Sequence, residues 1–240
     1  MFTIVLPCAG AGTRLGLPYP KELHVVEEGR SLVDYSLAHL SADPALVDKA
    51  VCVIAPGKER VPDYVAGRME EHAPVETAYF NEAYSEWPGS IRSAEAHFGA
   101  RNIALLPDSR VTPEAGTRLL PQFAEAFESG ADVVFAYKRV SDPAALAALG
   151  AISVEGEAVT DFFDKPRDLA DAARFNAFWV AFGFTKDVGP SLLELMQRSV
   201  ARERVDFATL GCAIRGFEVA DYIDLGTWPS IHRYLGLHGA

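Results

Sequence analysis

Short apolar runs alternate with segments of helical periodicity along the first half of the chain. The apolar runs have the length and composition of buried strands, and they predict strands over residues 3–8, 50–55, 75–80, 102–106 and 131–137. Between them, apolar residues recur every three or four positions, which predicts helices over 31–40, 59–69, 89–98 and 112–128. Ser31 stands where a helix N-cap is expected. Strands that alternate with crossover helices predict a mainly parallel sheet with helices on both faces.

The pattern changes after about residue 140. Glu155-Gly156-Glu157 separates two short apolar runs, which predicts a hairpin of residues 151–154 and 158–163. Further strands are predicted at 175–184 and 215–223, and further helices at 191–201 and 229–235. No linker rich in Gly, Ser or Pro and no internal repeat interrupts the chain, so we expect a single domain over residues 1–240.

Composition and charge narrow the classes of partner. The chain is 49% hydrophobic and 23% charged, which is typical of globular proteins. It has 22 Lys and Arg against 33 Asp and Glu, a net charge of −11 that disfavours binding to nucleic acid. The sequence shows no signal peptide and no apolar run near the ~20 residues of a membrane span. Three scattered cysteines indicate a reducing compartment, so we expect a cytoplasmic protein without a membrane partner.

The most informative segment follows the first predicted strand. In parallel sheets ligands bind beyond the carboxyl ends of the strands, which directs attention to residues 9–22, 56–58, 81–89 and 107–111. Gly10 and Gly12 let backbone N–H groups converge on an anion, and Arg14 and Lys21 add positive charge. The segment is not a G-x-G-x-x-G fingerprint, because Leu15 replaces the third glycine, and no Gly-Lys-Ser/Thr of a P-loop is present.

This loop resembles the signature of sugar-1-phosphate nucleotidyltransferases, in which G-x-G-T-R-[LF] is followed by P-K. The sequence has G-A-G-T-R-L from residue 10 and Pro-Lys ending at Lys21. The resemblance implies that the loop holds the triphosphate of a nucleotide, through Ala9, Gly10, Gly12 and Thr13. It also implies that Arg14 and Lys21 are catalytic cations, which neutralise charge on the α-phosphorus and the departing pyrophosphate.

Three later segments match the same family in chain order. L-L-P-D ends in Asp108, and D-L-G-T begins with Asp224. By resemblance, these two carboxylates bind a metal, and the implied cofactor is Mg²⁺, which takes one or two protein carboxylates. F-D-K-P resembles the family's E-K-P, with Asp164 in place of the Glu. It implies that Lys165 contacts the sugar phosphate as a third catalytic cation and that Asp164 contacts the substrate.

Weaker matches extend the implied site. Gly150 in L-G-A and Asn176 in N-A correspond to segments that contact the sugar. Gly89 matches a glycine that contacts the nucleotide base, but no Gln lies between residues 75 and 95, where the family usually carries one. Glu82 and Glu86 stand near that position, and a carboxylate there can accept the imide N–H of uracil or thymine, or the N1–H of guanine.

The resemblance runs from residue 4 to about residue 235. It implies one α/β domain of the nucleotide-diphospho-sugar transferase fold: a mostly parallel, Rossmann-like sheet with helices on both faces. Residues 1–140 would form the nucleotide-binding half and 141–240 a mixed-strand half that binds the sugar phosphate. The implied reaction couples a nucleoside triphosphate, UTP or dTTP, to a sugar-1-phosphate, with release of pyrophosphate. The implied assembly is a monomer or small homo-oligomer.

Two alternatives stay open. The first is a cytidylyl- or guanylyltransferase that acts on another sugar, cyclitol, polyol or aminoalcohol phosphate. The second is a non-catalytic, nucleotide-sensing subunit with the same fold. Loss of Arg14, Lys21, Asp108 or Asp224 would favour the second, and the sequence retains all four.

Overall fold

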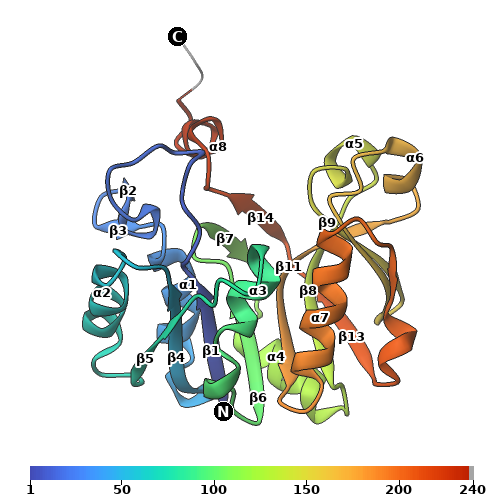
Figure 1. Ribbon diagram of the computed structural model, residues 1–240, viewed down its shortest axis with the longest axis horizontal. Coiled ribbons are helices and arrows are strands. Elements are labelled where there is room, and N and C mark those ends of the chain that lie inside the picture. The colour runs from blue at the N-terminus through green and yellow to red at the C-terminus, as the bar shows by residue number, and fades with distance from the viewer. Residues whose placement is uncertain (238–240) are drawn as a thin grey trace.

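The computed structural model describes residues 1–237. Its main feature is a 10-stranded sheet in the order β12-β10-β13-β8-β11-β6-β1-β4-β5, with β9 paired to β10 and β11 (Figure 1). These strands are β1 (Phe2–Pro7), β4 (Val47–Ile54), β5 (Val75–Tyr79), β6 (Arg101–Leu105), β8 (Val133–Arg139), β9 (Gly150–Glu155), β10 (Ala158–Asp164), β11 (Ala177–Thr185), β12 (Val205–Asp206) and β13 (Ile214–Glu218). Two small sheets pair β2 (Val25–Glu27) with β3 (Arg30–Ser31), and β7 (Ser109–Thr112) with β14 (Asp221–Asp224).

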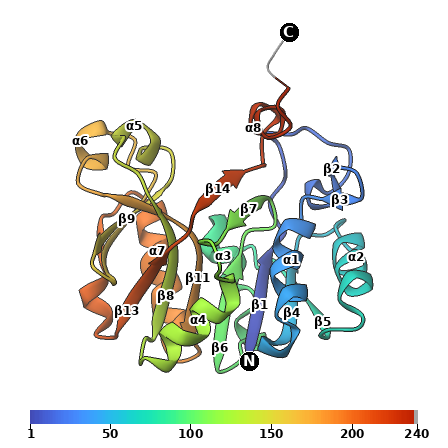
Figure 2. The ribbon, with the colours of Figure 1, turned by 180° about the vertical axis from the view of Figure 1, so that it is seen from behind.

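Helices cover both faces of the sheet. One face carries α1 (Asp34–Ala42), α2 (Arg60–Met69) and α4 (Leu119–Glu128), and the other carries α3 (Glu86–Arg92) and α7 (Gly189–Val200) (Figures 1 and 2). The short helices α5 (Pro143–Leu146) and α6 (Leu169–Ala172) lie together, and α8 (Trp228–Tyr234) packs on β14. None of the helices within residues 1–237 has the length and apolar character that a membrane span requires.

Burial explains why the predicted strands form. β1 lies between β4 and β6 and is parallel to both, so its two edges are paired, and helices cover its two faces, so its residues from Phe2 to Leu6 are buried. β11 is antiparallel to both β6 and β8, which it separates. The segments before and after residue 140 therefore share one sheet. The predicted α/β fold, with a parallel first half and a mixed second half, is confirmed.

Two predicted elements are divided in the structure. Only the second part of the helix predicted over residues 112–128 is helical, because Thr112 pairs with β14 and Gly116 has a left-handed φ of 79°, which a right-handed helix cannot include. The strand predicted over 215–223 is two strands in different sheets. β13 is parallel to β8, and β14 leaves the main sheet to pair with β7.

Two helix starts also differ from the prediction. Ser31 is not an N-cap: it lies in β3, and its amide and hydroxyl both donate to the Asp34 carboxylate, at 2.7 and 2.8 Å. Val33 holds the cap position of α1 without a side-chain hydrogen bond. The helix predicted to begin at Gly89 begins at Glu86 and ends at Arg92, followed by a 3₁₀ turn over Glu95–His97.

Candidate active site

A cleft of about 680 Å³ opens where the carboxyl ends of β1 and β6 face the hairpin of β9 and β10. Both halves of the chain contribute to its walls, as a ligand site at the carboxyl end of a parallel sheet requires. The predicted site residues that line it are Ala9, Gly10, Gly12, Thr13, Arg14, Lys21, Asp108, Gly150, Asp164, Lys165 and Asp224. No histidine within residues 1–237 lines this cleft.

The β7–β14 ribbon brings the two predicted metal carboxylates together. Asp224 ends β14 opposite Ser109, the residue that follows Asp108 in the chain. The amide of Leu225 donates to the carbonyl of Asp108 at 2.9 Å, which fixes the two backbones side by side. The chain leaves the main sheet after β13 and pairs with β7 as β14, and this pairing places Asp224 in the cleft.

Two cations neutralise these carboxylates. The Lys21 ammonium donates to Asp108, and Arg14 Nη1 donates to Asp224 Oδ2 at 3.1 Å, with its Nη2 3.9 Å from Asp108 Oδ2. Burial alone would lower the pKa of Lys21, but the charge and the hydrogen bond of Asp108 outweigh it, so this pKa is raised and the ammonium stays protonated. The Lys21 side chain is 14% exposed and the Arg14 side chain 57%, so Arg14 is the more accessible cation.

Gly226 leaves open the space between these groups. Its amide donates to Asp224 Oδ1 at 2.7 Å. A Cβ atom at this position would lie 2.7 Å from Arg14 Nη2. It would also lie 2.8 Å from Asp108 Oδ2 and 2.8 Å from Asp224 Oδ1. The three charged groups thus converge on a volume that only a glycine leaves free.

A tight turn at Gly12 shapes the glycine loop. Gly12 has a φ of 67°, which favours glycine, and its carbonyl accepts hydrogen bonds from the amides of Leu15 and Gly16. Behind the loop, the Lys58 ammonium pairs with the buried Glu22 carboxylate. The sequence analysis assigned no role to Glu22 or Lys58. Lys58 does lie in the 56–58 loop, which was expected at the ligand-binding edge of the sheet.

Two tryptophans form the opposite wall, beside Asp164 and Gly150. The rings of Trp87 and Trp179 lie 4.7 Å apart, and Trp87 Nε1 donates to Asp164 Oδ1 at 3.4 Å. Trp179 Nε1 is buried and has no hydrogen-bond partner among residues 1–237, and it would lie 2.0 Å from a Cβ at Gly150, so only glycine fits there. Burial raises the pKa of Asp164, although the nearby charge of Lys165 opposes that shift. No motif in the sequence pointed to these tryptophans.

Two predicted site residues lie outside the cleft lining. The side-chain amide of Asn176 accepts from the amide of Val154 and donates to its carbonyl, both at 2.9 Å, so it is occupied in holding β9. Gly89 is buried in α3, where a Cβ would lie 2.6 Å from Tyr84 Cβ. Its lack of a side chain serves packing against Tyr84.

One of the two glutamates considered for base recognition faces the cleft. Glu86 lines it from the first turn of α3, with a left-handed φ of 57°. Such a conformation is uncommon outside glycine and marks a backbone held by its surroundings. Glu82 lies in the preceding loop, is exposed and is not part of the lining.

Comparison with known proteins gives one partial sequence match and a broad structural likeness. No family model matches the chain. A segment of 62 residues, 26% of the chain, is 44% identical to the 2-C-methyl-D-erythritol 4-phosphate cytidylyltransferases of Xanthomonas euvesicatoria and Xanthomonas axonopodis. That match spans only 23% of those relatives' own length.

The solved structures cover nearly the whole chain at low identity. A UDP-glucose pyrophosphorylase from Acinetobacter superposes with a TM-score of 0.77 at 18% identity, over 97% of this chain and 91% of its own. A glucose-1-phosphate thymidylyltransferase, described as putative, from Bacillus anthracis gives 0.76 at 15% identity, over 99% and 94%. The inositol-1-phosphate CTP transferase of T. maritima gives 0.68 at 18% identity, over 95% and 90%. The chain therefore has the fold of sugar-phosphate nucleotidyltransferases.

Proposed function

We propose that this protein is a nucleotidyltransferase that couples a nucleoside triphosphate, UTP or dTTP, to a sugar-1-phosphate, forming an NDP-sugar and pyrophosphate. One observation carries the proposal. Arg14, Lys21, Asp108 and Asp224, which are scattered along the sequence, converge beside the glycine loop in a single cleft. The fold shared with sugar-phosphate nucleotidyltransferases supports the same chemistry.

The proposed reaction needs positioning and charge stabilisation more than proton transfer. An oxygen of the sugar phosphate attacks the α-phosphorus, a new P–O bond forms, and the bond to the bridging oxygen of the β-phosphate breaks. That bridging oxygen leaves with the electron pair as part of pyrophosphate. The nucleophile is already an anion, so no general base is required. The loop from Ala9 to Thr13 would hold the triphosphate, and Arg14 and Lys21 would stabilise the developing charge.

Asp108 and Asp224 would hold the magnesium ion. Within residues 1–237, no cluster of three or more His, Cys, Asp or Glu side chains offers a complete protein cage. The pair suits Mg²⁺, because this ion binds one or two protein carboxylates and completes its octahedron with phosphate oxygens and water. A bound Mg²⁺ would neutralise charge on the phosphates.

The acceptor would bind at the tryptophan wall. Lys165 would contact the phosphate of the sugar, and Asp164 and Gly150, which line the same wall as Trp87 and Trp179, would contact the rest of the acceptor. The amide of Asn176 already has two backbone partners, so its proposed contribution is to hold β9 in place.

A second candidate function is a cytidylyltransferase that uses a polyol phosphate. The 62-residue match to methylerythritol phosphate cytidylyltransferases favours it. The Asp164-Lys165 and Asp224–Thr227 segments, which resemble sugar-specific enzymes, favour the first. A non-catalytic subunit is the least supported reading, since all four charged residues are present and converge.

The deciding experiment is a matrix of substrates. Each of UTP, dTTP, CTP, GTP and ATP is incubated with Mg²⁺ and a panel of sugar-1-phosphates, methylerythritol 4-phosphate and inositol phosphate, and pyrophosphate release is measured. We expect release that depends on both substrates, with UTP or dTTP preferred. Release with CTP and a polyol phosphate would support the second candidate, and no release from any pair would refute the enzymatic function.

A further inference from the structure

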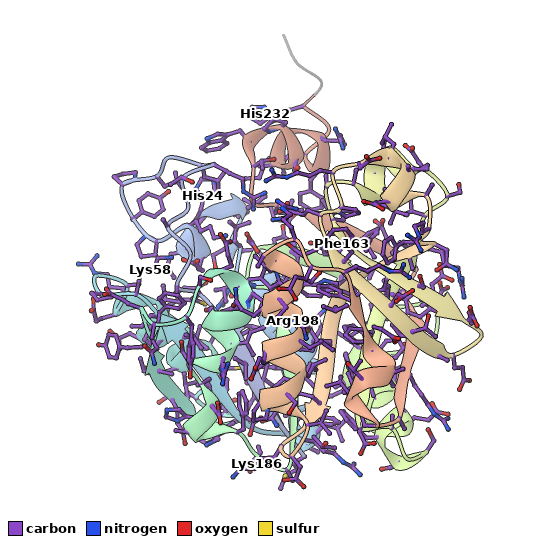
Figure 3. The ribbon with its side chains drawn as sticks, turned by 45° about the vertical axis from the view of Figure 1, so that its right-hand side comes forward. His24, Lys58, Phe163, Lys186, Arg198 and His232 are labelled. Carbon is purple, nitrogen blue, oxygen red and sulfur yellow. The ribbon has the colours of Figure 1, made fainter. Side chains whose placement is uncertain are left out.

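A buried ion pair lies directly behind the glycine loop. The Glu22 side chain is 0% exposed and the Lys58 side chain 12%, and Lys58 Nζ lies 3.1 and 3.0 Å from the two carboxylate oxygens. Figure 3 labels Lys58 beside the N-terminal segment that carries His24. Burying two charges has a large desolvation cost, and an apolar pair of similar size would often be as stable. Stability alone therefore does not account for this pair.

The Lys58 ammonium also binds the loop itself. It donates to the carbonyl of Cys8 at 2.7 Å and to the carbonyl of Gly10 at 2.6 Å. In a trans peptide unit the N–H points opposite to the C=O. The two carbonyls face Lys58, so the amides of Ala9 and Ala11 point the other way. Within residues 1–237 neither amide has a hydrogen-bond acceptor.

The Glu22–Lys58 pair is connected along the chain to Lys21, one of the proposed catalytic cations. Glu22 follows Lys21 in the 3₁₀ turn of Lys21–Leu23, and its carbonyl accepts the amide of Val33 at 3.0 Å. Lys21 pairs with Asp108 on the cleft side of this turn, while Glu22 pairs with Lys58 on its inner side. One dipeptide thus links the metal carboxylates to the back of the phosphate loop.

We propose that Lys58 is a positioning residue: held by Glu22, its ammonium fixes the Cys8 and Gly10 peptide units so that the Ala9 and Ala11 amides face the triphosphate. This inference rests on the proposed function, because it assumes that the loop binds a nucleotide. Lys58 does not touch the substrate in this role. Its effect therefore falls on nucleotide affinity and loop order, and not on the acceptor.

The test separates loop positioning from stability by replacing the whole pair. Lys58→Met alone leaves the Glu22 charge buried and unpaired, and we expect its Tm to fall by about 6–20 °C. The double variant Lys58→Met/Glu22→Leu removes both charges, and we expect it to recover most of the Tm that Lys58→Met loses. Its loop carbonyls still lack the ammonium, so the amides lose their aim at the charged phosphates, and we expect the Kd for the triphosphate to rise ~10- to 100-fold. The KM for the acceptor should stay within about twofold.

Lys49→Met is the matched control. Lys49, near the start of β4, donates to Glu76 of β5 at 2.9 Å, whereas Lys58 lies in the loop that follows the end of β4. It should leave the Kd for the triphosphate unchanged. A second readout needs no activity: the amides of Leu15 and Gly16, which donate to the Gly12 carbonyl in the nucleotide-free protein, should exchange hydrogen faster in the double variant than in the wild type or in Lys49→Met.

The outcomes are distinct. A double variant that recovers its Tm and binds the triphosphate like the wild type, with unchanged exchange in the loop, overturns the positioning role and leaves the proposed function intact. A wild-type protein that binds no triphosphate overturns both. Weaker binding that accompanies an equal loss of acceptor affinity would show a general disturbance of the cleft, and it too would overturn the assigned role.

Discussion

Gly226→Ala is the most direct perturbation of the charged cluster. The added methyl would lie 2.7–2.8 Å from Arg14, Asp108 and Asp224, where ordinary contact is at least 3.4 Å. Each group would have to retreat by about 0.6–0.7 Å, which is the difference between those distances. Displacements of this size in a reacting geometry cost up to ~100-fold in rate. We expect kcat to fall ~10- to 100-fold.

The fold should tolerate the same change. The obstructing atoms are side-chain ends rather than backbone, so the cost in unfolding free energy should lie at the low end of the ~1–3 kcal/mol typical of overpacking. Gly67→Ala is the control, because Gly67 lies exposed in α2 with nothing within 4 Å of the added methyl. It should keep full activity and gain up to about 1 kcal/mol of stability.

Steady-state rates of pyrophosphate release and thermal denaturation of both variants provide the assay. A Gly226→Ala enzyme with wild-type kcat would refute the reasoning that these three groups must share one confined space. If Gly226→Ala loses much of its Tm but the folded enzyme keeps the wild-type kcat, Gly226 matters for folding and not for the reaction.

The remaining predictions concern charge. Asp224→Asn should lower turnover by ~100-fold or more at limiting Mg²⁺. Asp108→Asn should do the same and also reduce stability, because it leaves the largely buried Lys21 ammonium without its partner; near-normal rates in both would remove the metal assignment. Arg14→Ala should depress kcat more than the KM of the sugar phosphate, whereas Lys165→Ala should chiefly raise that KM, and a reversed pattern in steady-state kinetics would contradict these roles. Burial lowers the pKa of His39 from 6.5 to about 4, opposed by a hydrogen bond with the Val111 backbone. The unfolded chain therefore takes up this proton first, so the contribution of His39 to the unfolding free energy should be constant above pH 6.5 and fall toward pH 4 by at most about 1.4 kcal/mol per pH unit. Urea denaturation across this range should give a flatter profile for His39→Gln, and an identical slope would contradict the assignment.

Local patterns predicted the centre of the fold well. The strands β1, β4 and β6 are buried on both faces over their apolar runs, which are Ile4–Leu6, Ala50–Ile54 and Ile103–Leu105, and it is these runs that the pattern identifies. The prediction was wrong where pairing between distant segments overrides local pattern. Residues up to Thr112 continue into a predicted helix, but their partner is β14, more than a hundred residues later in the chain. The strand predicted over 215–223 was divided for the same reason.

The residues of the candidate site likewise fall into those that the sequence predicted and those that only the folded chain brings together. Its charged residues could be found from the sequence, because Arg14, Lys21, Asp108 and Asp224 stand in short segments that resemble the motifs of a known family. The tryptophan wall could not, since Trp87 and Trp179 come from α3 and β11 and meet only in the folded chain. Lys58 could not either, because its partners are two backbone carbonyls and one buried carboxylate. Asn176 matched a motif, yet its amide is engaged by Val154.

The placement of β11 between β6 and β8 has a consequence for synthesis on the ribosome. β6 lies next to β1, and its other edge is covered only when β11 joins it, so residues 1–140 alone would leave that edge unpaired. An unpaired strand edge is a template for association with other chains. The nascent protein must therefore keep this edge protected until residues up to Thr185 have emerged, and a fragment ending near residue 140 should aggregate unless the remaining segment is supplied to complete the sheet.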